Sequence, residues 1–225
     1  REGLENGQVD IVVGTHAILS KQTNFKNLGL VIVDEEQRFG VTHKEKLKQL
    51  RADVHMLTLT ATPIPRSLCL TRFGDLDISL IRELPPGRQR VVTSRVSDPG
   101  QMAKAWDFVR QQIAKGRQAY VVCPRVEGQD EDDNAAAETV FQHLLSTEFS
   151  GLRVALLHGR MNREQRHDVM DRFRNHEIDV LVSTTVIEVG VNVPNATIMV
   201  IQQAERFGLA QLHQLRGRIC RGRFQ

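Results

Sequence analysis

The sequence predicts an α/β fold with doubly wound parallel sheets, because short apolar strands alternate along it with helical segments. Most of these strands are rich in Val, Ile and Leu without polar alternation, which is typical of parallel strands covered by helices on both faces. In such sheets, ligands gather beyond the carboxyl ends of the strands. The predicted strands are Val9–Val13, Leu28–Val33, Val54–Leu59, Gln118–Val122, Leu152–Leu157, Asp179–Val182 and Thr197–Ile201.

Two helices are predicted from their start signals. The stretch Gln101–Ala114 follows Asp98, which suits an N-cap, and Pro99, which suits the first turn of a helix. The stretch Arg163–Phe173 follows Asn162, another preferred N-cap residue. Helices in these places complete βαβ units with the neighbouring strands.

A linker is predicted at Glu83–Arg88, where two prolines and a glycine interrupt the pattern. A β-rich stretch, Val91–Val96, follows the linker. We therefore expect two domains, residues 1–87 and residues 88–225, and the chain is long enough for each to bury its own core.

The composition, with 40% hydrophobic and 25% charged residues, is that of an ordinary globular protein. No apolar run is long enough to span a bilayer, so a membrane role is not expected. The cysteines Cys69, Cys123 and Cys220 stand far apart without C-x-x-C spacing, which argues against a disulfide framework or a zinc site. A reducing cytoplasm fits this pattern.

The net charge of +3 indicates little by itself, but the charges are unevenly distributed. Arginines crowd the carboxyl-terminal end, whereas Glu127 and Asp130–Asp133 form an acidic stretch in the middle of the chain. We interpret that acidic stretch as a solvated loop.

An apolar strand ends abruptly in acidic residues at Leu30–Gln37. Asp34 could supply the single oxygen ligand that Mg²⁺ needs when nucleotide phosphates and water complete its coordination. Glu35 could then orient and deprotonate the water that attacks the γ-phosphate of ATP. Taken alone, the Asp-Glu pair is explained more simply as a solvated strand end.

Two further strand ends carry polar residues. Thr60 and Thr62 follow the strand after the acidic one, where they could bond the carboxylates. Gly14-Thr15-His16 follows the first predicted strand, where small side chains and amides can approach a nucleic-acid phosphate. His16 could equally be an ordinary loop histidine.

The second half offers two candidate phosphate sites. Ser183–Gly190 follows a buried strand with hydroxyl residues and then a glycine. In the last predicted helix, the i, i+4, i+7 spacing places Gln214, Arg218 and Arg221 on one face, and arginine suits a γ-phosphate. The alternative is a solvated basic helix, although Gly217 in mid-helix suggests a close backbone approach.

Read in order, several segments resemble the successive motifs of superfamily 2 helicases: GTHAIL, DEEQRFG, TLTATPIPR, LLHGRM, TTVIEVGVNVP and ERFGLAQLHQLRGRICRG. The longer strings FGDLDISLIRELPPGR, NATIMVI and AERFGLAQLHQLRGR resemble the RecG branch of bacterial branched-DNA helicases. The stretch His43–Lys46 with TLTATPIPR is also similar to the transcription-repair coupling factor, a sister branch.

The resemblance implies a monomeric motor of two RecA-like domains that uses ATP and Mg²⁺ to remodel stalled forks and recombination junctions in the bacterial cytoplasm, at the nucleoid. Residues 1–87 would be the carboxyl-terminal part of the helicase ATP-binding domain. Residues 88–225 would be the helicase C-terminal domain, itself truncated. The partner would be branched or forked duplex DNA.

The resemblance also implies roles by position. The catalytic residues would be Asp34, Glu35, Arg218 and Arg221. The nucleotide would be bound by Asp34, which also holds the metal, and by Glu188, Gly190, Gln214, Arg218 and Arg221. Coupling would involve Gln37, Thr60 and Thr62, and the DNA contacts would be Gly14, Thr15, His16, Thr184 and Thr185.

Three residues depart from the family pattern. Gln37 stands where a histidine is usual, Asn192 where an aspartate is expected, and Cys220 where a glycine is usual. We expect these substitutions to affect the interdomain contact, the nucleotide or coupling contact, and the arginine turn, respectively.

No G-x-x-x-x-G-K-[ST] loop precedes the acidic motif, so the β- and γ-phosphates lack their usual cradle. The chain begins at Arg1 and ends directly after the arginine-rich segment, and we expect both ends to be cut. The family's amino-terminal wedge domain and terminal helical hairpin are also missing. The fragment is therefore predicted to be inactive alone. The alternative functions are a transcription-repair coupling translocase and a non-catalytic DNA-binding module that has lost the phosphate loop.

Overall fold

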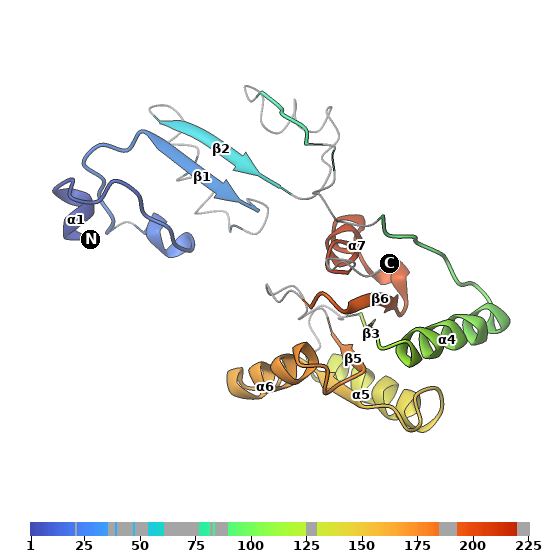
Figure 1. Cartoon of the computed structure of the whole chain (residues 1–225). Coiled ribbons are helices and arrows are strands. Elements are labelled where there is room, and N and C mark those ends of the chain that lie inside the picture. Colours follow the sequence, from blue (N-terminus) through green and yellow to red (C-terminus); the bar gives the residue numbers. More distant parts are fainter. Residues whose placement is uncertain are drawn as a thin grey trace. The chain divides into compact units, whose positions relative to one another are not determined.

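The computed structural model describes residues 1–20, 22–35, 39, 47, 54–60, 77–81, 83, 90–124, 130–184 and 193–219, the side chains of 130–134 excepted. The chain divides into two compact units, Arg1–Gly74 and Asp75–Gln225. Figure 1 traces the elements of each unit along the chain. None of the helices in these described ranges is long and apolar enough to cross a membrane.

The first unit holds a pair of parallel strands, β1 (Leu30–Asp34) and β2 (His55–Leu59), in register from Leu30 with His55 to Asp34 with Leu59. They confirm the two strands predicted in this part of the sequence. One face of the pair is covered, with Val33 buried beside Thr58. The other face carries four exposed aliphatic side chains, those of Leu30, Ile32, Leu57 and Leu59.

The strand predicted at Val9–Val13 is wrong, because this segment is irregular in the structure. The segment follows helix α1 (Glu2–Glu5), and the N–H groups of Gln8 and Val9 donate to the carbonyl of Gly3. Apolar composition alone does not make a strand, which needs a hydrogen-bonding neighbour along its length. Among the described residues, none pairs with this segment in a ladder.

The second unit is built on one four-stranded sheet with the order β4-β5-β3-β6, in which every neighbouring pair is parallel. This arrangement confirms the predicted doubly wound α/β class. The strands are β3 (Gln118–Val122), β4 (Val154–Leu157), β5 (Val180–Ser183) and β6 (Ala196–Ile201), and each lies within two residues of its predicted bounds.

Helices cover both faces of this sheet (Figure 1). Strand β3 shows the arrangement, because Ala119 and Val121 pack with Trp106 and Phe149, whereas Tyr120 packs on the opposite face with Phe173. The helices concerned are α4 (Pro99–Ala114) and α5 (Asp130–Ser146) on one face, and α6 (Arg163–Arg174) and α7 (Leu209–Arg216) on the other. Burial on both faces explains why the strands are continuously apolar.

The predicted helix starts are confirmed by their caps. The carboxylate of Asp98 accepts a hydrogen bond from the Gln101 N–H at 2.9 Å, with Pro99 as the first residue of α4. At α6, the Asn162 side chain accepts from the Gln165 N–H while the Gln165 side chain accepts from the Asn162 N–H. This reciprocal pair is a capping box, which satisfies N–H groups that the helix leaves without partners.

The acidic stretch is not a loop at its carboxyl-terminal end, because α5 begins at Asp130 and includes Asp133. Carboxylates stabilise the first turn of a helix by interacting with the partial positive charge at its amino end, which explains the error. Glu127 lies outside the described residues.

The β-rich stretch predicted at Val91–Val96 is also wrong, since it pairs with none of the described strands. Only Val91 and Val96 are partly covered, and Val91 packs on the core next to α6 and α7. A single apolar anchor of this kind fixes the path of an extended segment without adding it to the sheet.

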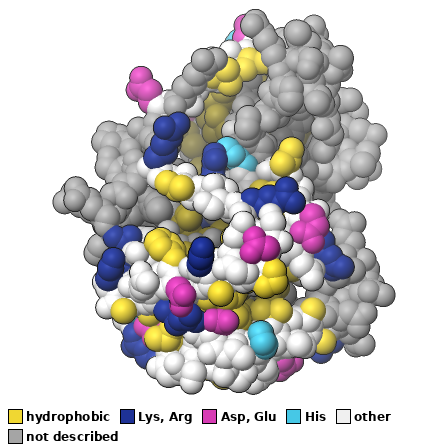
Figure 2. Space-filling view, turned by 90° about the vertical axis from the view of Figure 1, so that its right-hand side faces the viewer, with side chains coloured by type: hydrophobic (Ala, Val, Ile, Leu, Met, Phe, Trp, Pro, Cys, Tyr) yellow, Lys and Arg dark blue, Asp and Glu magenta, His cyan; other side chains and the backbone are white. Residues whose placement is uncertain are grey.

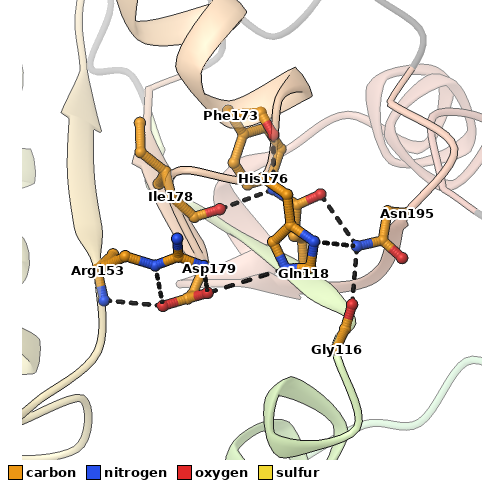
Figure 3. A network of polar contacts seen from close by, with 8 residues as sticks. All are labelled: Gly116, Gln118, Arg153, Phe173, His176, Ile178, Asp179 and Asn195. Carbon is orange, nitrogen blue, oxygen red and sulfur yellow. Dashed lines mark hydrogen bonds and ion pairs between the residues drawn. The ribbon is translucent and has the colours of Figure 1, made fainter.

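A buried glutamine ties together the amino ends of the strands (Figure 3). The Gln118 side chain is wholly buried and donates to the carbonyls of Phe173 at 2.6 Å and Ile178 at 2.7 Å. Its own amide oxygen accepts from the Asn195 side chain at 3.3 Å, and Asn195 also donates to the Gly116 carbonyl at 2.8 Å. The end of α6 and the starts of β3, β5 and β6 therefore meet at one side chain.

The fourth strand joins this network through an ion pair. The Arg153 guanidinium, just before β4, donates to both carboxylate oxygens of Asp179, just before β5, at 2.6 and 3.1 Å. Burial alone would raise the pKa of Asp179, but the hydrogen bonds and positive charge of Arg153 outweigh it, so the pKa lies below its ordinary value.

Replacing Gln118 tests this tie. We expect Gln118→Leu to lower the free energy of unfolding by about 2–3 kcal/mol, because buried carbonyls lose their donor. Gln118→Glu should cost more at neutral pH, because a buried carboxylate would face two carbonyl oxygens. Urea denaturation followed by the fluorescence of Trp106, the only tryptophan, measures both. The control Gln111→Leu, on the exposed side of α4, should change stability by less than about 0.5 kcal/mol.

The Arg153–Asp179 ion pair predicts that the free energy of unfolding depends on pH. A carboxylate with a lowered pKa stabilises the fold above its unfolded pKa, and this contribution disappears as pH falls through the folded value. The difference in free energy of unfolding between the natural chain and Asp179→Asn, called here the stability gap, should therefore be constant above about pH 5. It should disappear as the pH falls below 3.8. Asp168→Asn, at an exposed ion pair of 3.9 Å, should show little gap at any pH. A gap for Asp179→Asn that persists at pH 2 would contradict this assignment.

Candidate functional site

The carboxyl end of β1 presents two carboxylates. Asp34 is its last residue and is exposed, and its side chain has no hydrogen-bond or ion-pair partner among the described residues. Glu35 follows with a φ of 55°, in the left-handed region, and its N–H donates to the carbonyl of Leu59 at 2.9 Å. This bond continues the ladder one residue beyond the strand.

The same hydrogen bond brings the acidic pair next to Thr60, which directly follows Leu59. Two strand ends that are far apart in sequence therefore meet, as the order of the motifs predicts for parallel neighbours. An unpaired carboxylate at such an edge fits Mg²⁺, which binds through one or two protein oxygens while phosphates and water complete its shell. Gln37 and Thr62 lie outside the described residues.

Gly14-Thr15-His16 does not end a strand, because the preceding segment is irregular. Thr15 is instead the N-cap of a short 3₁₀ helix, η1 (His16–Leu19), and its hydroxyl accepts from the Ala17 N–H at 3.5 Å. The His16 ring lies edge-on to Phe39, with ring centroids 6.3 Å apart. This segment is thereby linked to a residue just beyond the acidic motif.

In the second unit, the carboxyl ends of β3, β4 and β5 are joined by backbone bonds. The Cys123 N–H donates to the Ser183 carbonyl at 2.7 Å, and the Thr184 N–H donates to the Leu157 carbonyl at 3.2 Å. Thr184 is only 3% exposed, which suits holding the turn in place better than direct contact with DNA. The other predicted residues of this motif, Thr185, Glu188, Gly190 and Asn192, lie outside the described residues.

The loop after β4 and the first residue of α6 contribute basic residues to the same edge, and no role was predicted for them from the sequence. Arg160 and Arg163 are exposed, and the Arg160 N–H donates to the His158 ring at 3.3 Å. The signal was present as two arginines on either side of the N-cap residue Asn162, shortly after a buried strand. Because Thr184 bonds to Leu157, this loop lies beside the hydroxyl-rich turn.

The prediction that Gln214, Arg218 and Arg221 lie on one face of the last helix is wrong for Arg218. Helix α7 ends at Arg216 and Gly217 is its C-cap, so Arg218 lies beyond the helix. Glycine is a common helix terminator, which explains why a residue assumed to be mid-helix ends it. Gln214 remains in the last turn of α7, and the Arg218 N–H donates to the Leu215 carbonyl at 2.9 Å. Arg221 and Cys220 lie outside the described residues.

The surface in Figure 2 mixes charges of both signs. Basic, acidic and hydrophobic side chains are interspersed over the described part of this face, without a broad basic area. Any anionic ligand on this face would be bound by individual loops instead of by a general field.

Two domain models match the chain. The DEAD/DEAH box helicase model matches residues 1–70, and the helicase conserved C-terminal domain model matches residues 102–223, more than half of the chain. The chain therefore belongs to the helicase family that these models describe.

Within that family, the chain is similar to RecG proteins. It is 48% identical to the ATP-dependent DNA helicase RecG of Mycobacterium tuberculosis (strain ATCC 25618 / H37Rv), in an alignment that covers 99% of this chain and 32% of the relative. The predicted resemblance to RecG is confirmed. The chain spans about a third of the length of the curated relatives it matches.

Solved structures show the same relationship. The chain matches a structure of RecG bound to a three-way DNA junction with a TM-score of 0.67 and 45% identity, over 98% of this chain and 28% of that one. It also matches S. cerevisiae Dbp5 L327V bound to RNA and ADP BeF3, with a TM-score of 0.57 and 13% identity, over 93% and 55%. The second likeness concerns the fold alone, and together they confirm the predicted RecA-like domains.

Cys123 directly follows β3 at this edge, and burial lowers the reactivity of its thiol. It is 2% exposed, and burial raises its pKa from 9.0 to about 11, which leaves about a hundredfold less thiolate at neutral pH. In a chain carrying Cys69→Ser and Cys220→Ser, iodoacetamide should modify Cys123 at least about a hundredfold more slowly in buffer than in urea. Mass spectrometry of timed samples measures this ratio. Equal rates in the two solvents would show that the thiol is accessible.

Proposed function

We propose that this chain forms part of an ATP-driven DNA helicase motor that remodels branched DNA. The observation that carries this proposal is the pair Asp34 and Glu35 at the end of β1, tied by a 2.9 Å hydrogen bond to the segment that contains Thr60. The similarity to RecG relatives over nearly the whole chain supports it. Acting on chromosomal DNA, such a motor would work as a monomer at the bacterial nucleoid.

The acidic pair would carry out the chemistry of ATP hydrolysis. Asp34 would hold Mg²⁺ through its free carboxylate, and Glu35 would orient the attacking water and accept its proton. The bound metal would neutralise charge on the β- and γ-phosphates. Because the two residues are adjacent in the chain and at the edge of the sheet, one nucleotide could reach both.

The second unit would supply positive charge to the phosphates. We assign this role to Arg218 and Arg221, since a guanidinium stays charged and can bond two oxygens at once. Nucleotide contacts would also come from Glu188, Gly190 and Gln214. The domains would be residues 1–87, the carboxyl-terminal part of the ATP-binding domain, and residues 88–225, the helicase C-terminal domain.

Coupling and DNA binding would use the other strand ends. Thr60, Thr62 and Gln37 would transmit the state of the nucleotide. DNA phosphates would be contacted by Gly14, Thr15, His16 and Thr185, with the exposed Arg160 and Arg163 added from the structure. The buried Thr184 would hold the turn in place instead of contacting DNA. Contacts to phosphate fix the position of a protein on DNA without reading its sequence, which suits an enzyme that recognises the shape of a junction.

Hydrolysis of ATP stimulated by three-way junction DNA tests the proposal, measured on the protein from the longest open reading frame that contains this chain. Glu35→Gln should lower kcat by at least about a hundredfold, because the water loses its general base. Asp34→Asn should abolish activity at low Mg²⁺. The 225-residue chain alone should hydrolyse ATP hardly at all, because its sequence has no G-x-x-x-x-G-K-[ST] loop.

Asp168→Asn, in an exposed ion pair on α6, is the control and should leave the rate unchanged. Full activity of Glu35→Gln would overturn the assigned chemistry. Salt-dependent DNA binding without ATP hydrolysis by the longer protein would show a DNA-binding module instead of a motor.

A further inference from the structure

Glu35 has a left-handed backbone conformation, which is uncommon for a residue other than glycine. Among the described residues, the non-glycine residues with positive φ are Glu35, His176 and Gln203. His176 is explained by the end of α6, where its N–H donates to the Phe173 carbonyl and the Glu177 N–H donates to the Arg172 carbonyl. Glu35 directly follows a strand, and such conformations cost energy that the surrounding structure must offset.

The left-handed conformation changes the face to which Glu35 belongs. Side chains alternate along a strand, so an extended Glu35 would lie on the face of Val33, which is 4% exposed. Rotating φ from the extended region to 55° carries Cβ to the other side of the preceding peptide plane, toward the face of Asp34. Glu35 is accordingly only half-buried. The two carboxylates then serve one side of the sheet.

The peptide plane that precedes Glu35 is held by a hydrogen bond to the neighbouring strand. The Glu35 N–H donates to the carbonyl of Leu59, and Leu59 is in register with Asp34. This bond keeps the amide in the plane of the ladder while the side chain leaves the alternation. The group of Leu59 that bonds to Glu35 is its backbone carbonyl, and the Leu59 side chain is exposed.

We propose that Leu59 is a positioning residue for hydrolysis: its carbonyl fixes the peptide plane that precedes Glu35, and from this plane the left-handed φ directs the Glu35 side chain toward the face of Asp34. This inference rests on the proposed function, in which Glu35 acts on the water. In this arrangement, the backbone at the carboxyl end of β2 helps to orient the general base Glu35. A shift of Leu59 relative to β1 would therefore turn the Glu35 carboxylate away from the direction in which it acts on the water.

The first test concerns conformation and is independent of ATP. In the 225-residue chain, the Glu35 amide should show a strong nuclear Overhauser effect to its own Hα, as positive φ requires, and slow hydrogen exchange. Melting temperatures should rank Glu35→Gly and Glu35→Asn above Glu35→Gln by about 2 °C, with Glu35→Val lowest, because a β-branched side chain tolerates this region poorly.

The matched control is Ile32, an exposed and extended residue of the same strand. There the order should reverse, with Ile32→Gly melting below Ile32→Val. If Glu35 follows the order of Ile32, or if its amide exchanges freely, the left-handed conformation is absent and the inference is overturned.

The second test removes the hydrogen bond while keeping the carboxylate. In the longer protein, an ester in place of the Glu35 amide deletes the donor to Leu59. It should lower kcat for ATP by about tenfold or more with KM unchanged, because the base is misdirected while nucleotide binding is intact. The same ester at Thr93, exposed and outside the helices and strands, should have no effect.

The outcomes separate the two proposals. An ester variant as fast as the natural protein, alongside an inactive Glu35→Gln, overturns the positioning role of Leu59 and leaves the proposed function standing. An active Glu35→Gln overturns the proposed function, whatever the conformation of Glu35. A loss confined to KM in the ester variant also overturns the positioning role.

Discussion

Parallel strands bring the residues at their carboxyl ends to a common edge only if the strands are aligned at their amino ends. In the second unit, the buried Gln118 side chain fixes this alignment. It joins β3 to the ends of α6 and to the starts of β5 and β6, while the Arg153–Asp179 pair adds β4. None of these groups lies at the edge where ligands are expected. They still determine how the carboxyl ends of the strands are aligned, because the hydrogen bonds of the ladder maintain the register along strands of four to six residues.

In the first unit, the parallel strands β1 and β2 must also be aligned, and fewer described contacts hold them in place. A two-stranded sheet is marginal by itself, and here only one of its faces is covered. The hydrogen bond from Glu35 to Leu59 extends the ladder at the end where the carboxylates emerge. A single backbone bond thus contributes to the pairing of β1 with β2 and, in the proposed mechanism, to the direction of the Glu35 side chain.

Burial separates the roles of residues that share an edge. Thr184 and Cys123 sit at strand ends, but their side chains are covered, so they can only fix the turns and the core beneath them. Asp34 and Arg160 lie at equivalent strand ends and are exposed, so they can meet a metal or a phosphate. The sequence pattern places all of these residues at or shortly after the end of a strand. Only the packing of the helices determines which of their side chains are covered and which are exposed.

Sequence reasoning succeeded where one local cause determines the structure. Continuous apolar runs gave six of the strands, and the caps at Asp98 and Asn162 gave two helix starts, because burial and orphan N–H groups act over a few residues. It failed at Val9–Val13, where a strand needs a partner that its own residues do not encode. It also missed the left-handed Glu35, since periodicity predicts which face a strand residue occupies and this residue departs from it. The Glu35 N–H bonds to a carbonyl of another strand, so this part of the structure can be found only once the neighbouring strand is in place.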